Sequence, residues 1–213
     1  MKWIGLSEVM PCFGRIVPLD QSKMLVAGLD LGYSKDRSVL TIRQGNVIID
    51  TIVWKHADPE DLGDEIIGIM NNRKIEMLGL DALGPGPHMF SKLNKALPNR
   101  IVPIKYSEAA IDSKTYTNLR SEAWGKIKDW LKDGCIPAGR DQEWITDLCN
   151  ISYGYDSHGR YALESKKLLI SKGLPSTDMA DSLGISLCFN DNKKIVTLSS
   201  YKRTTDNCDW SGF

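Results

Sequence analysis

The feature that most constrains this chain is an acidic residue inside an apolar stretch. Residues 24–42 read MLVAGLDLGYSKDRSVLTI, and Asp30 directly follows a run typical of a buried strand. A carboxylate in such a place is strongly unfavourable unless it is paired, hydrogen-bonded or bound to a cation. We therefore expect the fold to bring a partner to Asp30.

Size and composition limit what that partner can be. The chain has 213 residues, of which 42% are hydrophobic and 25% charged, and this favours one large globular domain with a substantial core. The 27 basic residues balance the 27 acidic ones, so bulk charge gives no argument for nucleic-acid binding. Contact with DNA would have to come from local patches or from metal ions.

Other classes of site and location find little support in the sequence. The five cysteines are scattered without a C-x-x-C pair and the three histidines lie far apart, so neither a disulfide framework nor a zinc site is expected. No apolar run is long enough to span a bilayer, and the first residues lack the layout of a signal peptide. We expect an intracellular protein that makes no membrane contact.

Hydrophobic periodicity and turn residues predict an α/β fold. Strands at 24–31, 38–42 and 47–54 should form an antiparallel meander, and alternation of strands and helices afterwards implies parallel crossovers. The later elements are expected as helices at 58–72, 88–97, 115–133, 144–150 and 175–189, strands at 74–81 and 100–106, and a β-hairpin within 151–165.

Four carboxylates fall where such a sheet could bring them together. Asp30 ends the first strand, Asp81 ends the strand EMLGLD, and Asp178 and Asp181 are three residues apart on one face of the last helix. Strand 24–31 should lie centrally, beside the strand that carries Asp81. Clustered carboxylates repel unless cations bind between them, and oxygen ligands without His or Cys select Mg²⁺ or Mn²⁺.

Each acid also has an ordinary structural interpretation. Asp30 with Gly32 could form a turn, Asp81 could end its strand, and Asp178 could favour the positive end of a helix. Asp181 is harder to explain in this way, because it lies in a mostly apolar helix. The combination, in this order along the chain, carries more weight than any member.

That order of elements resembles a known family, the C-terminal nuclease domain of the large terminase subunit of tailed bacteriophages. The resemblance covers residues 24–190, and its most specific parts are STDMADSL, similar to the family's P-D-x-A-D-A-L, and NLRSEAW, similar to N-x-R-A-E-x-W. This sequence departs from the family pattern at two positions: Thr177 stands where the family often has Pro, and Ser182 stands where it often has Ala. Neither departure removes a carboxylate. The stretches that carry the resemblance are VAGLDLGYSKDRSVLTI, MLGLDALGPGPHMFSKL, YTNLRSEAWGKIKDWLKDG, LESKKLL and GLPSTDMADSLGISL.

The resemblance implies a fold and an activity. The fold would be ribonuclease H-like, with a mixed central sheet, flanking helices and a late β-hairpin. Asp30, Asp81 and Asp181 fall at the family's catalytic, metal-binding acids, and Asp178 matches a further acid that related Holliday junction resolvases carry. The implied reaction is two-metal-ion hydrolysis of double-stranded DNA during viral genome packaging, with Mg²⁺ or Mn²⁺ and with Asp30 bridging the two ions.

The same resemblance implies partners and a setting. The expected partners are double-stranded DNA, the terminase ATPase domain, the small terminase subunit and the portal, in the cytoplasm of an infected bacterial host. The packaging ATPase itself is not expected within this chain, because no G-x-x-x-x-G-K-[ST] loop occurs. We expect residues 1–23 to be a linker or extension, 24–190 the nuclease domain, and 191–213 a partly disordered tail.

A local DNA-binding surface is a further expectation. Its basic members lie on or after the late hairpin, where they could meet the duplex backbone, although such a run is often only a solvated face. Two glycines in ALGPGP could let the backbone approach a phosphate, or form a plain loop. Arg120 is expected in an ion pair, and Trp124 in the core. The candidate DNA-binding residues are Arg160, Lys166, Lys167, Lys172, Gly84 and Gly86.

Alternatives of other kinds remain open at this stage. A Holliday-junction-resolvase-like nuclease shares the acids. An actin-like ATPase fragment shares the look of GLDLGYSKDRSVLTI, but a second phosphate hairpin is missing. The third alternative is a non-catalytic DNA-binding module. Substitution of Asp181 distinguishes a metal ligand from a purely structural acid, because loss of a metal ligand should abolish cleavage and relieve repulsion in the metal-free protein.

Overall fold

The computed structural model describes residues 1–32, 37–56, 58–84 and 86–192. Its centre is a five-stranded mixed sheet with the strand order β3-β2-β1-β4-β5. The first three strands pair antiparallel, and β1, β4 and β5 run parallel. The predicted meander, the central place of the first strand and the parallel continuation are all confirmed. The bounds are β1 Leu25–Asp30, β2 Arg37–Gln44, β3 Val47–Lys55, β4 Met77–Asp81 and β5 Ile101–Ile104.

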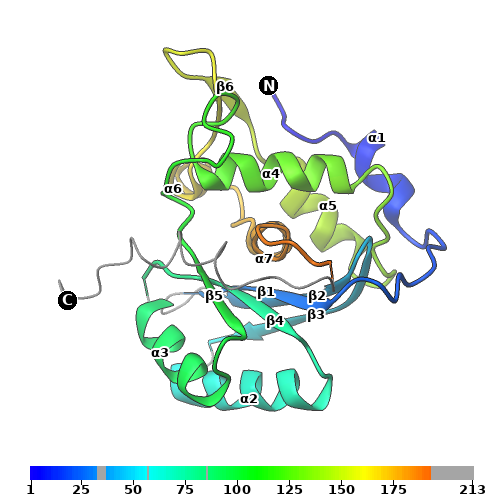
Figure 1. The fold of residues 1–213 in the computed structure, drawn as a ribbon. Coiled ribbons are helices and arrows are strands. Elements are labelled where there is room, and N and C mark those ends of the chain that lie inside the picture. Colours follow the sequence, from blue (N-terminus) through cyan, green and yellow to red (C-terminus); the bar gives the residue numbers. More distant parts are fainter. Residues whose placement is uncertain (33–36, 57, 85, 193–213) are drawn as a thin grey trace.

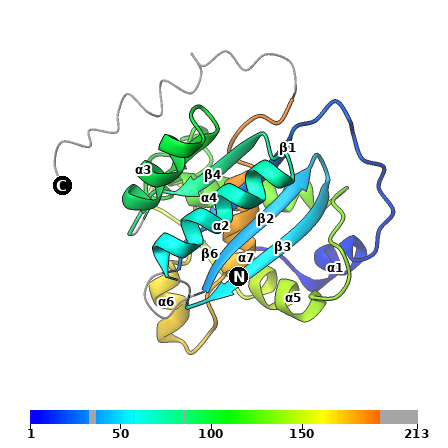
Figure 2. The same ribbon diagram turned by 90° about the horizontal axis from the view of Figure 1, so that it is seen from below.

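Helices cover both faces of this sheet (Figure 1). One face packs against α2 and α3, and the other packs against α7, with α4 and α5 lying outside α7 (Figures 1 and 2). The hairpin predicted within 151–165 is confirmed as a separate pair of strands, β6 and β7, and it is followed by α6, a short helix that was not predicted. The remaining bounds are α1 Leu6–Val9, the 3-10 helix η1 Met10–Cys12, α2 Pro59–Asn72, α3 Gly86–Ala96, α4 Leu119–Trp130, α5 Asp141–Cys149, β6 Tyr153–Tyr155, β7 Tyr161–Leu163, α6 Lys166–Ser171 and α7 Asp178–Ser186.

The first covering helix, α2, begins where its capping residues predict. The Asp58 side chain accepts the Glu60 N–H at 2.8 Å, and Pro59 occupies the first helical position, where no N–H is needed. Leu62, Ile66 and Met70 follow at helical spacing and are buried against the sheet. This face therefore closes one of the two main layers of the core.

The other layer depends on α7, whose residues are all buried. It lies so close to β1 that a Cβ at Gly28 would overlap the Ser182 carbonyl oxygen and come within 2.6 Å of the Ser186 N. Gly28 was not predicted from the sequence as a point of close contact. Gly184, which does occur in the predicted helix, instead faces the Tyr106 hydroxyl and α4, so it makes room for those neighbours.

The helix predicted at 115–133 is shorter in the structure. It begins at Leu119, after Asn118 has accepted the Ser121 N–H at 2.9 Å as N-cap. The preceding residues do not join it, because the Thr117 N–H donates to the Tyr161 carbonyl on β7 at 3.0 Å. Contacts with the hairpin thus override helical propensity at this end.

The segment before β1 is more structured than the irregular extension expected at 1–23. It contains α1 and η1, and it buries Trp3, Ile4, Val9 and Cys12 in the core beside α4 and α5. The tail expected at 191–213 lies outside the described residues from 193 onward. Within the part of the chain that is described, no helix is both long and apolar enough to cross a bilayer.

Candidate metal centre

Two of the predicted acids end neighbouring parallel strands. In the pairing of β1 with β4, Leu29 lies opposite Leu80, so Asp30 and Asp81 are the next positions of the two strands. Asp30 is 2% exposed, and Asp81 is partly buried with its Oδ1 accepting the Leu83 N–H at 3.1 Å. The topology therefore places both carboxylates at one edge of the sheet, as expected for the carboxyl ends of parallel strands.

The partner that Asp30 requires is the side chain of Lys166, at the start of α6. Its Nζ donates to Asp30 Oδ2 at 2.7 Å and lies 3.2 Å from Asp181 Oδ2 and 3.4 Å from Asp178 Oδ1. Three of the four predicted acids thus meet around one ammonium group. Lys166 was predicted from the sequence as a candidate for DNA contact, whereas the structure directs its amine into the carboxylate cluster.

Asp181 is fully buried and surrounded by donors. Oδ1 accepts from Trp124 Nε1 at 2.8 Å and from Arg120 Nε at 3.2 Å. Oδ2 accepts from the Thr177 hydroxyl at 2.8 Å and from Arg120 Nη2 at 3.3 Å, in addition to its contact with Lys166. The ion pair expected for Arg120 is confirmed. Thr177 and Trp124, which the sequence analysis gave no role at the acids, help to hold this carboxylate in one orientation.

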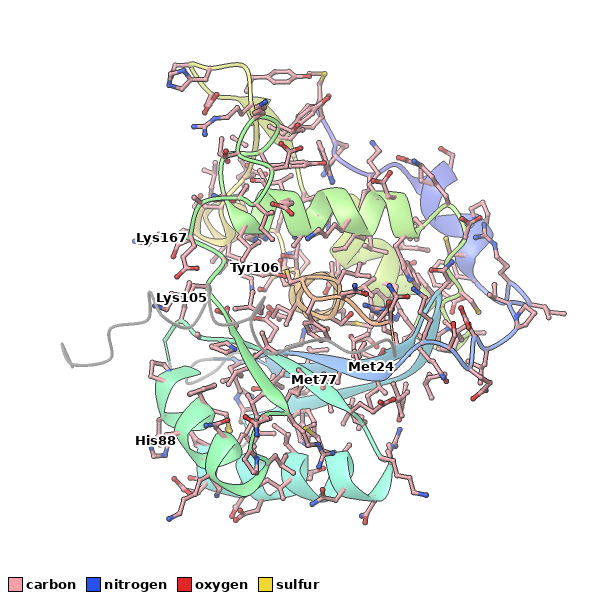
Figure 3. The ribbon with its side chains drawn as sticks, in the orientation of Figure 1. Met24, Met77, His88, Lys105, Tyr106 and Lys167 are labelled. Carbon is pink, nitrogen blue, oxygen red and sulfur yellow. The ribbon has the colours of Figure 1, made fainter. Side chains whose placement is uncertain are left out.

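The backbone of α7 is held at the same point. The Tyr106 hydroxyl, which follows β5, donates to the Asp181 carbonyl at 2.7 Å. Figure 3 shows Tyr106 between that strand and α7, whereas His88 projects from α3 on the other side of the sheet. Both the side chain and the main chain of Asp181 are therefore held in place.

These surroundings set the charges of the site. Burial raises the pKa of Asp30 well above its usual range, with the nearby carboxylates adding to the rise and Lys166 opposing it. Burial also acts to raise the pKa of Asp181, but Arg120 and Lys166 outweigh it and hold that pKa low. For Asp81, burial raises the pKa to about 6. Burial opposes the charge of Lys166, yet the three carboxylates keep its pKa well above the ordinary value.

Asp178, the fourth predicted acid, lies at the first position of α7 and is buried. Its Oδ2 accepts from Arg37 Nε at 3.0 Å, and its Oδ1 accepts from the Ser176 hydroxyl. Arg37 is the last residue of the predicted turn GYSKDR and begins β2 in the structure, whereas residues 33–36 of that turn are outside the described part of the chain. The sequence offered no signal for Arg37, because a basic residue in a polar turn is ordinarily exposed.

A pocket of about 290 Å³ opens beside these groups. Asp81, Lys166 and Arg120 line one side of it, and Leu83, Leu163 and Ser165 line others. Solvent and small ions can therefore reach Lys166 and Asp81 from this side. In the present conformation the described residues hold no group of three or more His, Cys, Asp or Glu side chains spaced to bind one metal ion. The cation at the centre is the Lys166 ammonium.

The remaining DNA-binding candidates have separate surroundings. Arg160 is paired with Asp156 in the hairpin turn at 2.7 Å, and Lys172 is paired with Glu164. Lys167 is exposed on α6, next to the residue that enters the site (Figure 3).

The backbone geometry explains why glycine occupies both positions in ALGPGP. Gly84 has φ +58°, and a Cβ at Gly86 would overlap the Asp81 carbonyl oxygen. They let the chain turn sharply from β4 into α3, directly after one of the four acids. DNA contact by these glycines stays a prediction.

No model of a protein family matches the sequence, and no curated protein matches it. Solved structures do share its fold. The nuclease domain of the large terminase subunit gp2 of bacterial virus Sf6 has a TM-score of 0.74 at 16% identity, covering 88% of this chain and 98% of that one. This is the fold of the large terminase nuclease domains.

Two further structures extend the comparison. A lysine-to-alanine mutant of the Sf6 nuclease domain, solved with manganese, has a TM-score of 0.75 at 15% identity and covers 88% of this chain and 99% of that one. The large terminase nuclease of thermophilic phage G20c, with bound magnesium, has a TM-score of 0.59 at 14% identity over 79% of this chain and 82% of that one. The predicted ribonuclease H-like fold is confirmed.

Proposed function

We propose that this chain is a divalent-metal-dependent endonuclease that cuts double-stranded DNA, as the nuclease part of a phage terminase. The observation that carries the proposal is the cluster of Asp30, Asp178 and Asp181 around the Lys166 ammonium, with Asp81 at the same edge of the sheet. Neighbours of the same fold are terminase nucleases solved with manganese and with magnesium.

The donor set fits divalent ions of this kind. All four acids offer oxygen, which is what Mg²⁺ and Mn²⁺ prefer. Lys166 acts as a stand-in cation, because its single charge lies within 3.4 Å of three carboxylates. Buried acids so arranged keep their charge only while a cation is near. Ions would therefore bind here when the Lys166 side chain moves out through the adjoining pocket.

Asp30, Asp81 and Asp181 would hold two divalent ions, with Asp178 as a further ligand. Such ions would lower the pKa of bound water and stabilise the leaving oxygen of a phosphodiester. The chain's own residues supply the orientation: Arg120, Trp124 and Thr177 hold Asp181. In the metal-free protein burial raises the pKa of Asp81 to about 6, so protons would compete with metal ions for this carboxylate below that pH.

DNA would approach from the side of α6 and the pocket. Among the DNA-binding candidates on that side, Lys167 is exposed and could contact a phosphate without a change in its surroundings. Arg160 and Lys172 would have to exchange their carboxylate partners for phosphates. For Lys172 this would leave the nearly buried Glu164 carboxylate without its counter-ion, which disfavours the exchange. We place residues 24–190 as the nuclease domain, working with the terminase ATPase, the small subunit and the portal in the cytoplasm of the infected bacterium.

The experiment that tests this function is cleavage of supercoiled plasmid in EDTA, Mg²⁺ or Mn²⁺. The wild-type chain should nick and linearise the plasmid only with a metal, and Asp30→Asn should abolish both. A matched control is Asp50→Asn, which removes a partly exposed carboxylate on β3 that is paired with Arg73 at the end of α2.

The outcomes separate the alternatives. Cleavage that persists in Asp30→Asn, or in EDTA, would refute the proposal. A four-way junction offered beside linear duplex distinguishes a resolvase, which would cut the junction in preference.

A further inference from the structure

A buried carboxylate outside the predicted site is connected to it through two contacts. Asp147, on α5, is 2% exposed and lies between Trp144 and Leu148 on the buried face of that helix. Its Oδ2 accepts the Met179 N–H at 2.7 Å, and both of its oxygens accept from Arg37 Nη2, at 3.0 and 2.9 Å. One carboxylate therefore ties α5 to the beginning of α7 and to the beginning of β2.

The first contact replaces an ordinary helix cap. An N-cap side chain normally accepts a backbone N–H from the first turn of its own helix. Thr177 is the N-cap of α7 but makes no such bond, because its hydroxyl oxygen instead accepts from Arg120 Nη2 at 3.0 Å while its O–H donates to Asp181 Oδ2. Asp147 accepts the N–H of Met179 in its place. The cap supplied from α5 thus leaves Thr177 free to orient Asp181.

The second contact orients Asp178 through Arg37. The guanidinium donates through Nη2 to Asp147 and through Nε to Asp178 Oδ2, and its Nη1 lies 3.3 Å from Glu143 Oε2. Because Oδ2 of Asp178 is held in this way, the other oxygen, Oδ1, is the one that faces Lys166 at 3.4 Å. Arg37 therefore binds Oδ2 of Asp178, and Oδ1 stays directed toward Lys166 and the carboxylate cluster.

We propose that Asp147 and Arg37 are positioning residues, which hold Asp178 and the first turn of α7 in the orientation needed to bind a divalent ion. The inference rests on the proposed function, since it concerns the same carboxylates. Groups that hydrogen-bond to metal ligands from behind typically change metal affinity or activity 10- to 100-fold when they are replaced. Neither residue touches the reacting atoms.

Asp147→Asn tests the pair with a small change of shape. The amide oxygen can still accept the Met179 N–H, but the charge that holds Arg37 is lost. Arg37→Lys is the second variant, because it keeps the charge and loses the fork that joins Asp147 to Asp178. The control is Thr146→Val, next to Asp147 on α5, whose hydroxyl donates to Gln142 of the same helix at 2.7 Å.

The readout is Mn²⁺ affinity, measured by calorimetric titration of protein shown to be folded by circular dichroism, with the thermal midpoint recorded separately. Both variants should bind Mn²⁺ about 10- to 100-fold more weakly than wild type while Thr146→Val does not change. Affinity unchanged in folded Arg37→Lys, or a loss confined to the thermal midpoint, would overturn the proposal.

Failure of the parent proposal gives a different pattern. Wild-type protein that neither binds Mn²⁺ nor cuts plasmid would overturn the proposed function and this inference together. Wild-type binding and cutting, with both variants as active and as tightly bound as wild type, would overturn the positioning role alone.

Discussion

Replacing Asp81 with Asn should stabilise the metal-free protein, by an amount that depends on pH. Burial raises the pKa of Asp81 from 3.8 to about 6 in the folded chain. The folded state therefore binds this proton more tightly than the unfolded state, and stability falls as pH rises from about 4 to 6. A difference of about 2 units corresponds to ~3 kcal/mol lost by pH 7. Asn avoids this loss and still accepts the Leu83 N–H.

The assay is urea unfolding in EDTA at several values between pH 4 and pH 8. The two proteins should be nearly equal in stability at pH 4, and Asp81→Asn should be more stable by up to ~3 kcal/mol at pH 7, or roughly 6–12 °C in thermal midpoint for a chain of this size. Asp133→Asn, just after the exposed end of α4, controls for the loss of one negative charge. A difference in stability that stays constant across the pH range would contradict this prediction, and so would an Asp81→Asn variant that is less stable than wild type at pH 7.

Three other substitutions follow from the same contacts. Asp181→Asn should destabilise the metal-free protein by about 3–5 kcal/mol in urea unfolding, because it leaves Arg120 buried without its counter-ion. A gain in stability would contradict this and would support the sequence-based expectation that the substitution relieves repulsion. Lys166→Ala should lower the thermal midpoint in EDTA yet bind Mn²⁺ at least about tenfold more tightly by calorimetry, since a competing charge is gone; weaker binding would contradict this. Gly28→Ala should cost about 3 kcal/mol or more in urea unfolding, since its Cβ overlaps α7, whereas Gly154→Ala in β6 has open space and should cost under about 1 kcal/mol.

The sequence predicted the sheet because its signals are local. Turn residues and alternation mark the meander, and the capping residues Asp58 and Pro59 mark the start of α2. The positions of Asp30 and Asp81 follow from strand order, since parallel neighbours end at the same edge. These features needed no knowledge of distant contacts.

What the sequence could not show is how the acids are neutralised. Clustered carboxylates imply a cation, but whether the cation is a metal or a side chain depends on contacts across the whole chain. Lys166 lies 136 residues from Asp30 in sequence, and Arg37 lies 141 from Asp178. Asp147 did leave a signal, an acid between Trp144 and Leu148 on an apolar helix face, which is the pattern that made Asp181 conspicuous.

X-ray diffraction from crystals soaked in Mn²⁺, with the anomalous signal used to locate the metal, tests most directly whether these acids bind divalent ions. Anomalous peaks are expected among Asp30, Asp81 and Asp181, together with a Lys166 amine that has left these carboxylates. Peaks elsewhere, or a Lys166 amine still in contact with Asp30 at saturating Mn²⁺, would contradict this expectation.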